Sequence, residues 1–297
     1  MRIVSWNIEN LAPWLAGGSR DLVAQWRALG EPDVLCLQEV RVRAGDAPLV
    51  DAMEHALPGF RCFHSLNRDA RNASFRGGRA YGVATYVRSG LRARHVPLAW
   101  DLEGRICATI LAARRLAIVN VYAVNGTARP HWDHDAMRIA GDRHAFKQAF
   151  IERLRRELQG APFAALAMIL IGDWNVSRER IDATPRLRTE EPHATARRRF
   201  NEELMPSLDL VDVFRERNPD ARAYTWINGR SRRLDAARVD YALVSRRLLA
   251  RVADATIEAD PALRPGSDHA PIAIELATRR DDRARNTVRL RHGRIHQ

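Results

Sequence analysis

The stretch Met168-Ile-Leu-Ile-Gly-Asp-Trp-Asn175 decides the fold, because it joins an unbroken apolar run to a carboxylate and an amide. The four apolar residues 168–171 predict a strand that is covered on both faces, as in a sheet buried between other layers. The residues that follow mark the carboxyl end of this strand. In α/β proteins ligands bind at that edge of a sheet, so the stretch predicts a buried sheet with a site beside it.

Seven further segments have the same strand-like character. They are residues 3–6, 34–37, 81–87, 106–112, 117–121, 239–244 and 272–276. Amphipathic patterns predict helices over residues 20–29, with Ser19 as N-cap, over 145–158 and over 198–204. Many strands with a few helices predict an α/β fold in which two packed β-sheets are flanked by helices.

Polar side chains stand at the ends of these strands as well. They are Asn7 and Glu9, Gln38 and Glu39, Tyr122, Asp240, and the pair Asp268 and His269 before the last strand. Taken singly, most such residues are typical of solvated strand ends, turns or caps. Asp240 differs, because a carboxylate inside an apolar strand is costly to bury without a partner, and His269 offers one. The whole set supplies oxygen ligands, a base and a His–Asp pair, which favours Mg²⁺ or Mn²⁺ over zinc.

The composition narrows the class of protein. The 297 residues carry 48 Lys and Arg against 36 Asp and Glu, a net charge of +12, and 46% of them are hydrophobic. This excludes a disordered or fibrous chain and makes polyanions expected partners, although a basic surface kept for solubility gives the same charge. Three widely spaced cysteines exclude a disulfide framework and, with no signal-peptide pattern at the N-terminus, favour a cytoplasmic protein beside the nucleoid.

Residues 1–277 are expected to form one domain, and residues 278–297 a disordered basic tail. From residue 279 onward the tail has seven arginines against two aspartates and no apolar period. A DNA-contacting arm is the alternative interpretation of this segment.

Ten short stretches follow one another in a specific order and at specific spacings. They are Ser5-Trp6-Asn7, Leu37-Gln38-Glu39, Tyr81-Gly82-Val83-Ala84, Glu103-Gly104-Arg105, Tyr122 with Asn125, Gly172-Asp173-Trp174-Asn175, Leu210-Val211-Asp212-Val213-Phe214-Arg215, Tyr224-Thr225-Trp226, Arg238-Val239-Asp240-Tyr241 and Ser267-Asp268-His269-Ala270-Pro271. In this order they resemble the exonuclease III and class II abasic endonuclease branch of the endonuclease–exonuclease–phosphatase family. The resemblance runs from Met1 to Ala277 and implies a four-layer α/β sandwich of the DNase I type.

The resemblance implies a catalytic role for five residues. Asp173 would orient and deprotonate the attacking water, and Asn175 would hold the phosphate and fix Asp173. Asp240 would hydrogen-bond His269, which would contact the scissile phosphate. Tyr122 would contact the phosphate too, and a phenolate role as nucleophile or base stays open.

Metal and substrate contacts are implied in the same way. Glu39 would bind Mg²⁺, with Mn²⁺ as a substitute, beside Asn7, and Asp268 would be a ligand or its neighbour. Trp226 would line the pocket for an extrahelical abasic deoxyribose, although a tryptophan in a strand is by composition more often core. Asn125 would contact the substrate.

Arginine-rich and histidine-rich segments depart from the family pattern or add to it. The loop Arg76-Gly-Gly-Arg79 either grips phosphates or is plainly solvated. The insertion His131-Trp-Asp-His-Asp135 has the composition of a metal-binding tract, but a polar loop is favoured over a DNA-facing one. Val124 stands where proline is frequent, and residues 178–188 carry arginine where some members have asparagine that contacts DNA.

These observations predict a monomeric Mg²⁺-dependent DNA-repair nuclease without a membrane partner. It would act on double-stranded DNA, cutting 5′ to abasic sites and removing nucleotides or blocking groups from 3′ ends. The alternative is a phosphatase or phosphodiesterase of the same family for a small phosphorylated substrate. A non-catalytic DNA-binding protein on this fold is a third hypothesis, which leaves the complete set of polar site residues unexplained.

Overall fold

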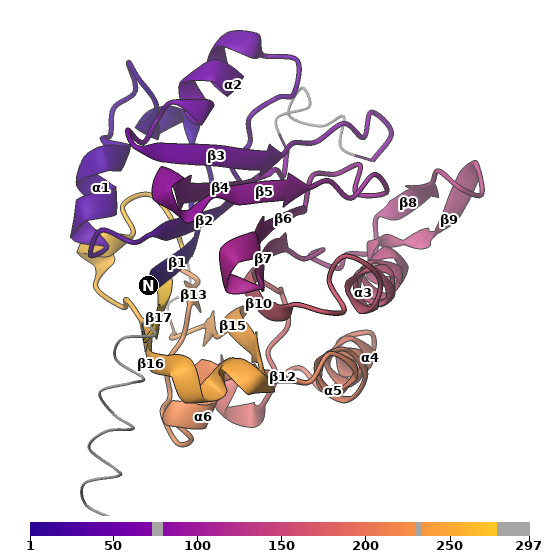
Figure 1. Ribbon diagram of the computed structural model, residues 1–297. Helices are drawn as coiled ribbons and strands as arrows, with labels where there is room; N and C mark the ends of the chain where they lie inside the picture. Colours follow the sequence, from indigo (N-terminus) through magenta and orange to yellow (C-terminus); the bar gives the residue numbers. More distant parts are fainter. Residues whose placement is uncertain (73–79, 230–232, 278–297) are drawn as a thin grey trace, which may run out of the picture.

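Two six-stranded sheets form the centre of the protein in the computed structural model, which describes residues 1–72, 80–229 and 233–277 (Figure 1). The first sheet contains, in spatial order, β16 (Val252–Ile257), β17 (Ile272–Leu276), β1 (Arg2–Asn7), β2 (Val34–Gln38), β4 (Val83–Arg88) and β3 (Phe60–Ser65). The second contains β12 (Leu210–Asp212), β15 (Asp240–Ser245), β10 (Ala167–Asp173), β7 (Leu116–Tyr122), β6 (Ile106–Leu111) and β5 (Ala93–Val96). Smaller sheets pair β8 (Pro130–Asp133) with β9 (Arg138–Asp142), and β14 (Ala236–Ala237) with both β11 (Ala183–Thr184) and β13 (Trp226–Ile227).

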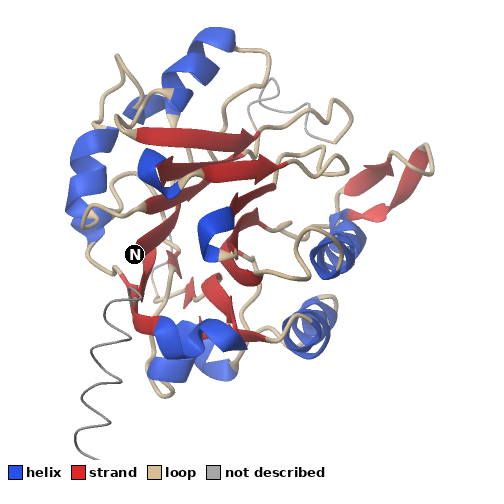
Figure 2. Ribbon diagram, viewed as in Figure 1, coloured by secondary structure: helices blue, strands red, loops and turns tan. Residues whose placement is uncertain are grey.

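Helices cover the outer face of each large sheet (Figure 2). The first sheet is covered by α1 (Leu22–Ala28) and α2 (Ala47–Glu54). The second is covered by α3 (Arg143–Gln159) and by a continuous helical stretch of α4 (His193–Arg198), a π-helical segment (Arg199–Leu204) and α5 (Met205–Ser207). The short helix α6 (Val213–Arg217) follows β12. The predicted four-layer sandwich is therefore confirmed.

Each layer boundary has its own apolar core, and β10 shows how the sequence builds two of them. Its residues alternate between the faces of the sheet, so Ile169 and Ile171 pack between the two sheets. Met168 and Leu170 point the other way, toward α3 and α4. Because both faces are covered, every residue of β10 is buried, which is why its residues 167–171 form an unbroken apolar run.

Some element boundaries differ from those expected. Helix α1 begins after Asp21, not Ser19, because the Asp21 carboxylate accepts hydrogen bonds from the backbone N–H groups of Val23 and Ala24. Strand β4 begins at Val83, since Tyr81 and Gly82 have positive φ angles that end the extended backbone. Strands β3 and β16 have half-exposed side chains without clear alternation, so the sequence pattern missed them.

Parallel pairing brings the functional strand ends to one edge of the sandwich. Strand β1 is parallel to β2, and β7 is parallel to β10, so their carboxyl ends point the same way. Asp173 at the end of β10 lies opposite Tyr122 on one neighbouring strand and opposite Asp240 on the other. Three predicted site residues are therefore side by side in a single sheet.

Two polar side chains join the sheets instead of entering the site. Asn120 on β7 donates from its amide to the carbonyl oxygens of Leu37 and Ala84 in the first sheet, at 3.2 and 3.0 Å. Its own Oδ1 accepts from Gln38 Nε2 at 2.7 Å. Both amides are fully buried, so the Gln38 amide, which the sequence pattern grouped with the site, is part of the contact between the sheets.

Among the described residues, no helix is both long and apolar enough to cross a membrane. The three cysteines, Cys36, Cys62 and Cys107, are free thiols. The tail predicted for residues 278–297 lies outside the described residues.

Candidate active site

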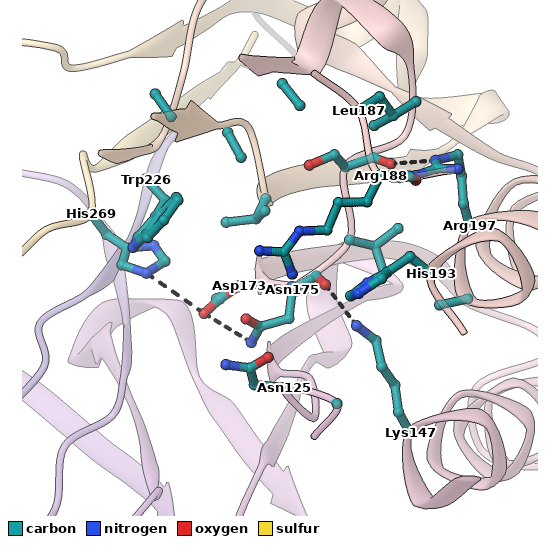
Figure 3. Close-up of a pocket in the computed structure, with 18 of the residues that line it drawn as sticks. Asn125, Lys147, Asp173, Asn175, Leu187, Arg188, His193, Arg197, Trp226 and His269 are labelled. Carbon is teal, nitrogen blue, oxygen red and sulfur yellow. Dashed lines mark hydrogen bonds and ion pairs between the residues drawn. The ribbon is translucent and has the colours of Figure 1, made fainter. Parts of the chain in front are cut away.

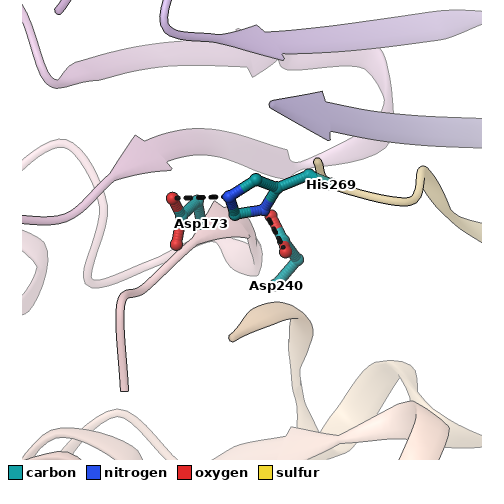
Figure 4. A group of neighbouring side chains, drawn as sticks. All are labelled: Asp173, Asp240 and His269. Carbon is teal, nitrogen blue, oxygen red and sulfur yellow. Dashed lines mark hydrogen bonds and ion pairs between the residues drawn. The ribbon is translucent and has the colours of Figure 1, made fainter. Parts of the chain in front are cut away.

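His269 lies between two buried aspartates at the carboxyl edge of the second sheet (Figure 4). Its Nδ1 is 2.8 Å from Asp240 Oδ2, and its Nε2 is 3.9 Å from Asp173 Oδ2. The backbone of His269 is fixed by a hydrogen bond, because its carbonyl oxygen accepts from the Trp6 indole N–H at 3.1 Å. The predicted His–Asp pair is present, and Asp173 faces the opposite edge of the same imidazole.

The electrostatics of this group favour one charge state. Burial opposes a charge on His269, but Asp240 and Asp173 more than offset it and raise the pKa of the imidazole. Burial and the neighbouring Asp240 raise the pKa of Asp173, while His269 and the Asn175 backbone N–H act against that rise. A protonated imidazole therefore points its Nε2–H into the site, beside a carboxylate that is poised to take up a proton.

Asparagine side chains fix the orientation of the Asp173 carboxylate. Asn175 donates to it twice, from its backbone N–H at 2.9 Å and from Nδ2 at 3.2 Å, and Asn7 donates from Nδ2 at 3.1 Å. Asn175 has a φ of 51°, a left-handed conformation that asparagine tolerates better than most residues. The turn after β10 thus folds back so that one amide holds the carboxylate that precedes it.

Gly172 is required by the close approach of β10 to β7. Its φ is 141°, and a Cβ at this position would overlap the carbonyl oxygen of Val121. We expect Gly172→Ala to destabilise the protein by about 2 kcal/mol and to lower turnover, because β10 must move away from β7 and carry Asp173 with it. Chemical denaturation and activity of the folded fraction measure the two effects. Gly90→Ala is the control, since nothing lies within 4 Å of a Cβ there.

A second group of polar side chains surrounds Glu39 at the end of β2. Glu39 Oε1 accepts from the Tyr122 hydroxyl at 2.7 Å and from Asn7 Nδ2 at 3.2 Å, and its Oε2 accepts from Arg41. Burial opposes ionisation of Glu39, but Arg41 and the hydrogen bond from Tyr122 more than offset it, so the pKa of this carboxyl is lowered. Burial and the Glu39 charge raise the pKa of Tyr122 well above its ordinary value, so Tyr122 is a neutral hydroxyl donor here.

Tyr122 is held in place by the Glu103-Gly104-Arg105 stretch. The Arg105 guanidinium lies 4.8 Å from the centre of the Tyr122 ring, and its Nη1 donates to the Tyr122 carbonyl oxygen at 3.2 Å. Glu103 in turn accepts from both Arg105 and Arg143, and all three side chains are buried. A buried ion cluster thus sets the position of the phenol.

Glu9 belongs to the same part of the cleft, although from the sequence it was only one of the polar strand-end residues and had no assigned role. Its carboxylate lies 3.7 Å from Arg41, and burial together with Asp268 and Glu39 raises its pKa, although Arg41 acts against the rise. Asp268 is half-exposed and accepts from the Trp226 indole at 2.8 Å. Glu9 stands two residues after Asn7, just past the end of β1, and that position was the available signal.

These donor atoms fit a hard divalent cation. Carboxylates from Glu9, Glu39 and Asp268 supply oxygen ligands on one side of the cleft, with Arg41 as the near cation. Asn7 is fully buried behind them: its Nδ2 donates to Glu39 and Asp173, and its Oδ1 accepts from the Glu9 backbone N–H. Asp173, Asp240 and His269 also each present an atom within 4.8 Å of the others. That second group is a weaker metal site, because a protonated imidazole hydrogen-bonded to Asp240 has no lone pair for a metal. The oxygen set around Glu39 is the better match to Mg²⁺ chemistry.

The polar groups open into a cleft of about 440 Å³ (Figure 3). Trp226 forms one wall and is anchored to the site by a bridge between its backbone and that of His269. Asn125 is exposed and lies on the cleft floor beside Asn175. The remaining predicted substrate contacts, Arg76 and Arg79, lie outside the described residues.

The histidine-rich insertion is a hairpin and not the polar loop that the sequence favoured. Strands β8 and β9 pair there, the His131 ring stacks on Phe146 with 3.8 Å between ring centres, and His134 Nε2 lies 3.1 Å from Asp69. Within the described residues these side chains do not gather into a metal-binding group.

Buried arginines and aspartates hold the wall that carries Trp226. Arg238 is fully buried and donates to both Asp182 and Asp212, at 2.8 and 3.1 Å. Arg215 also donates to Asp182, at 2.6 Å. The Leu210–Arg215 stretch and Arg238, which entered the sequence argument only as part of a resemblance, therefore form a structural ion network.

Comparison with known proteins agrees with this geometry. The model of the Endonuclease/Exonuclease/phosphatase family matches residues 4–269. The chain is 29% identical over 292 residues to Recombination repair protein 1 of Drosophila melanogaster, covering 92% of this chain and 37% of that protein. It is 26% identical over 290 residues to a DNA-(apurinic or apyrimidinic site) endonuclease of Dictyostelium discoideum, covering 92% and 70% of the two chains.

A solved AP endonuclease from Leishmania major has the same fold. Its TM-score is 0.73 at 25% identity, covering 93% of this chain and 87% of that one. Membership of one family thus explains the order of the motifs, the two packed sheets and the position of the site at their edge. The chain belongs to the Endonuclease/Exonuclease/phosphatase family, and within it resembles the AP endonucleases.

Proposed function

We propose that the protein is a Mg²⁺-dependent DNA-repair nuclease that cuts phosphodiesters 5′ to abasic sites and removes nucleotides or blocking groups from 3′ ends. The observation that carries the proposal is the line from Asp240 through His269 to Asp173, which opens into a cleft beside the Glu39 oxygen set. The net charge of +12 and the names of the related endonucleases support DNA as the substrate.

The side chains divide the work of hydrolysis. Asp173, fixed by Asn7 and Asn175, would accept the proton of the attacking water. His269, kept protonated by Asp240, would donate from Nε2 to a phosphoryl oxygen and stabilise the charge that develops there. The Tyr122 hydroxyl would orient a ligand oxygen or the Glu39 carboxylate as a neutral donor.

Mg²⁺ would be held by Glu39 and Asp268, with Glu9 close by, and Asn7 would orient Glu39 through the hydrogen bond from its Nδ2. When bound, the ion would supply positive charge for the phosphoryl oxygens, and Mn²⁺ would substitute for it. The oxygen-only donor set on that side of the cleft supports this assignment.

Replacing Glu39 with glutamine is expected to raise the Mg²⁺ concentration that gives half-maximal activity by about tenfold or more, because a charged ligand becomes a neutral one. A metal titration of the cleavage rate measures the shift. Glu54→Gln is the matched control, since Glu54 lies outside the cleft and pairs with His64. Equal metal requirements for wild type and Glu39→Gln would remove Glu39 from the metal site.

A duplex that carries one abasic analogue tests the proposal when it is compared with an intact duplex, with Mg²⁺ and with EDTA. We expect cleavage at the abasic site and loss of that cleavage in EDTA. Shortening of both duplexes from the 3′ end would make 3′ trimming the main activity. No metal-dependent cleavage of either would contradict the proposal and favour a small phosphorylated substrate, for which activity should depend weakly on salt.

A further inference from the structure

One arm of the cleft is walled by four basic side chains that the proposed chemistry does not use. His144 and Lys147 come from α3, His193 begins α4, and Arg188 lies in the segment before it. Figure 3 places His193 and Lys147 on the opposite side of Asn175 from Trp226 and His269, and the Arg188 guanidinium above Asn175. We call these four residues the basic arm.

Lys147 forms the floor of the basic arm. It is the only lysine in the chain, its side chain is buried, and its Nζ donates to the Asn175 carbonyl oxygen at 2.6 Å. An ammonium group has three donors, and within the described residues this is the single hydrogen bond that Nζ makes. Two donors of a buried cation therefore remain for a ligand in the cleft.

The two histidines are packed against each other and against the floor of the cleft. The rings of His144 and His193 meet edge to face with 5.8 Å between their centres. His144 lies so close to Gly126 that a Cβ there would overlap its Nδ1. Gly126 follows Asn125, so this contact fixes the imidazole at the cleft wall.

The basic arm holds like charges with little compensation. Burial, Arg188, Lys147 and His144 all lower the pKa of His193, and of the nearby groups Glu190 acts the other way. Glu190 is fully exposed. The Arg188 guanidinium makes no ion pair or hydrogen bond with the described residues, and it points into the cleft (Figure 3). Arg188 and Lys147 are the cations of this arm, because the lowered pKa leaves His193 largely uncharged in the free protein. An anion bound between them offsets their mutual repulsion.

We propose that the basic arm binds a second phosphate group of the substrate, separate from the scissile phosphate at Asp173 and His269. Imidazole, ammonium and guanidinium donors from three segments suit the several oxygens of one phosphate. This inference rests on the proposed nuclease function. The phosphate is either a backbone phosphodiester next to the cut or a terminal phosphate monoester, and both present the same anionic oxygens.

The test combines protein variants with altered DNA. Arg188→Ala with His193→Ala is expected to raise KM about tenfold, with a smaller effect on kcat, and to reduce the salt slope of log(kcat/KM) by about 1. In wild type, replacing one phosphodiester near the cut with a neutral methylphosphonate should raise KM by a similar factor. In the double variant, a methylphosphonate at the position that the basic arm contacts should raise KM no further, because the protein partner of that phosphate is already absent.

A second comparison separates the two sources of phosphate. If an internal methylphosphonate raises KM in wild type but not in the double variant, the bound group is a backbone phosphodiester. If removal of a terminal phosphate does so instead, the bound group is a phosphate monoester. The matched controls are Arg114→Ala and His55→Ala, which are exposed and outside the cleft, with Arg114 at the opposite end of β7 from Tyr122. Lys147→Gln should raise KM as well, and Lys147→Arg should raise it less, because arginine keeps the positive charge.

Two outcomes would overturn the inference. One is an unchanged KM in the double variant, and the other is equal sensitivity of variant and wild type to a neutral linkage at every position. If wild type cleaves no DNA, the proposed function fails first, and inorganic phosphate then tests the basic arm alone. Phosphate should shift the ring resonances of His144 and His193 in wild type and in Arg114→Ala, and an absence of these shifts would exclude the site.

Discussion

Replacing Asp173 with asparagine is expected to lower kcat by about 10³-fold or more while the fold remains intact. The amide keeps the shape of the carboxylate but cannot take a proton from water. It also turns a donor toward Asn7 and Asn175, whose amides now donate to Asp173 at 3.1 and 3.2 Å. The carboxylate that faces His269 Nε2 at 3.9 Å is lost as well.

Single-turnover cleavage at saturating Mg²⁺ measures the effect, with circular dichroism as the test of folding. Asp209→Asn is the control, because Asp209 is exposed, pairs with Arg246 at the surface, and has a φ of 48° that asparagine tolerates. His269→Ala should be similarly slow, and the double variant should be little slower than either one, since the two residues act on the same step. Turnover near that of wild type from folded Asp173→Asn would contradict the assignment of the base.

Replacing Asp182 with alanine is expected to lower the free energy of unfolding by about 3–5 kcal/mol. Asp182 is fully buried and accepts from Arg215 at 2.6 Å and from Arg238 at 2.8 Å. Without it, among the described residues, Arg238 keeps only Asp212 as a carboxylate partner, and Arg215 keeps only backbone carbonyl oxygens. A buried guanidinium without a carboxylate is costly, because no water replaces the lost partner.

Chemical denaturation measures this loss, and Asp209→Ala gives the comparison with an exposed ion pair. That control is expected to change the free energy of unfolding by less than about 1 kcal/mol, since exposed pairs are screened by water. Cleavage by the folded fraction of Asp182→Ala should fall too, because Asp182 holds the wall that carries Trp226. A loss below about 1 kcal/mol for Asp182→Ala would mean that the network adds little to stability.

Much of the site could be predicted from single strands and from the residues at their ends. The end of β10 placed Asp173 and Asn175 together, since residues two apart around a tight turn are near each other whatever the rest of the chain does. The His269–Asp240 pair was predicted because a buried carboxylate needs a partner, and the two are 2.8 Å apart. Local pattern and the cost of burial are sufficient for such inferences.

Other residues could not be placed from the sequence. Asn120 and Gln38 resemble strand-end site residues in pattern, and only the packing of one sheet on the other makes them an inter-sheet contact. Arg238 lies next to the predicted site along the chain, yet it turns away from it into an ion network with Asp182. The partner of a buried charge far away in sequence depends on which elements pack together.

The sequence by itself determined the two buried sheets, their helical cover and the residues at the catalytic edge, because unbroken apolar runs and the chemistry of strand ends are written into neighbouring residues. Only the tertiary structure decided that Glu9 joins the oxygen set, that the histidine-rich insertion is a hairpin and that Lys147 lies beneath Asn175. The reason is physical. These features depend on contacts between segments that are distant along the chain, and those contacts are fixed by the packing of whole layers rather than by any local pattern.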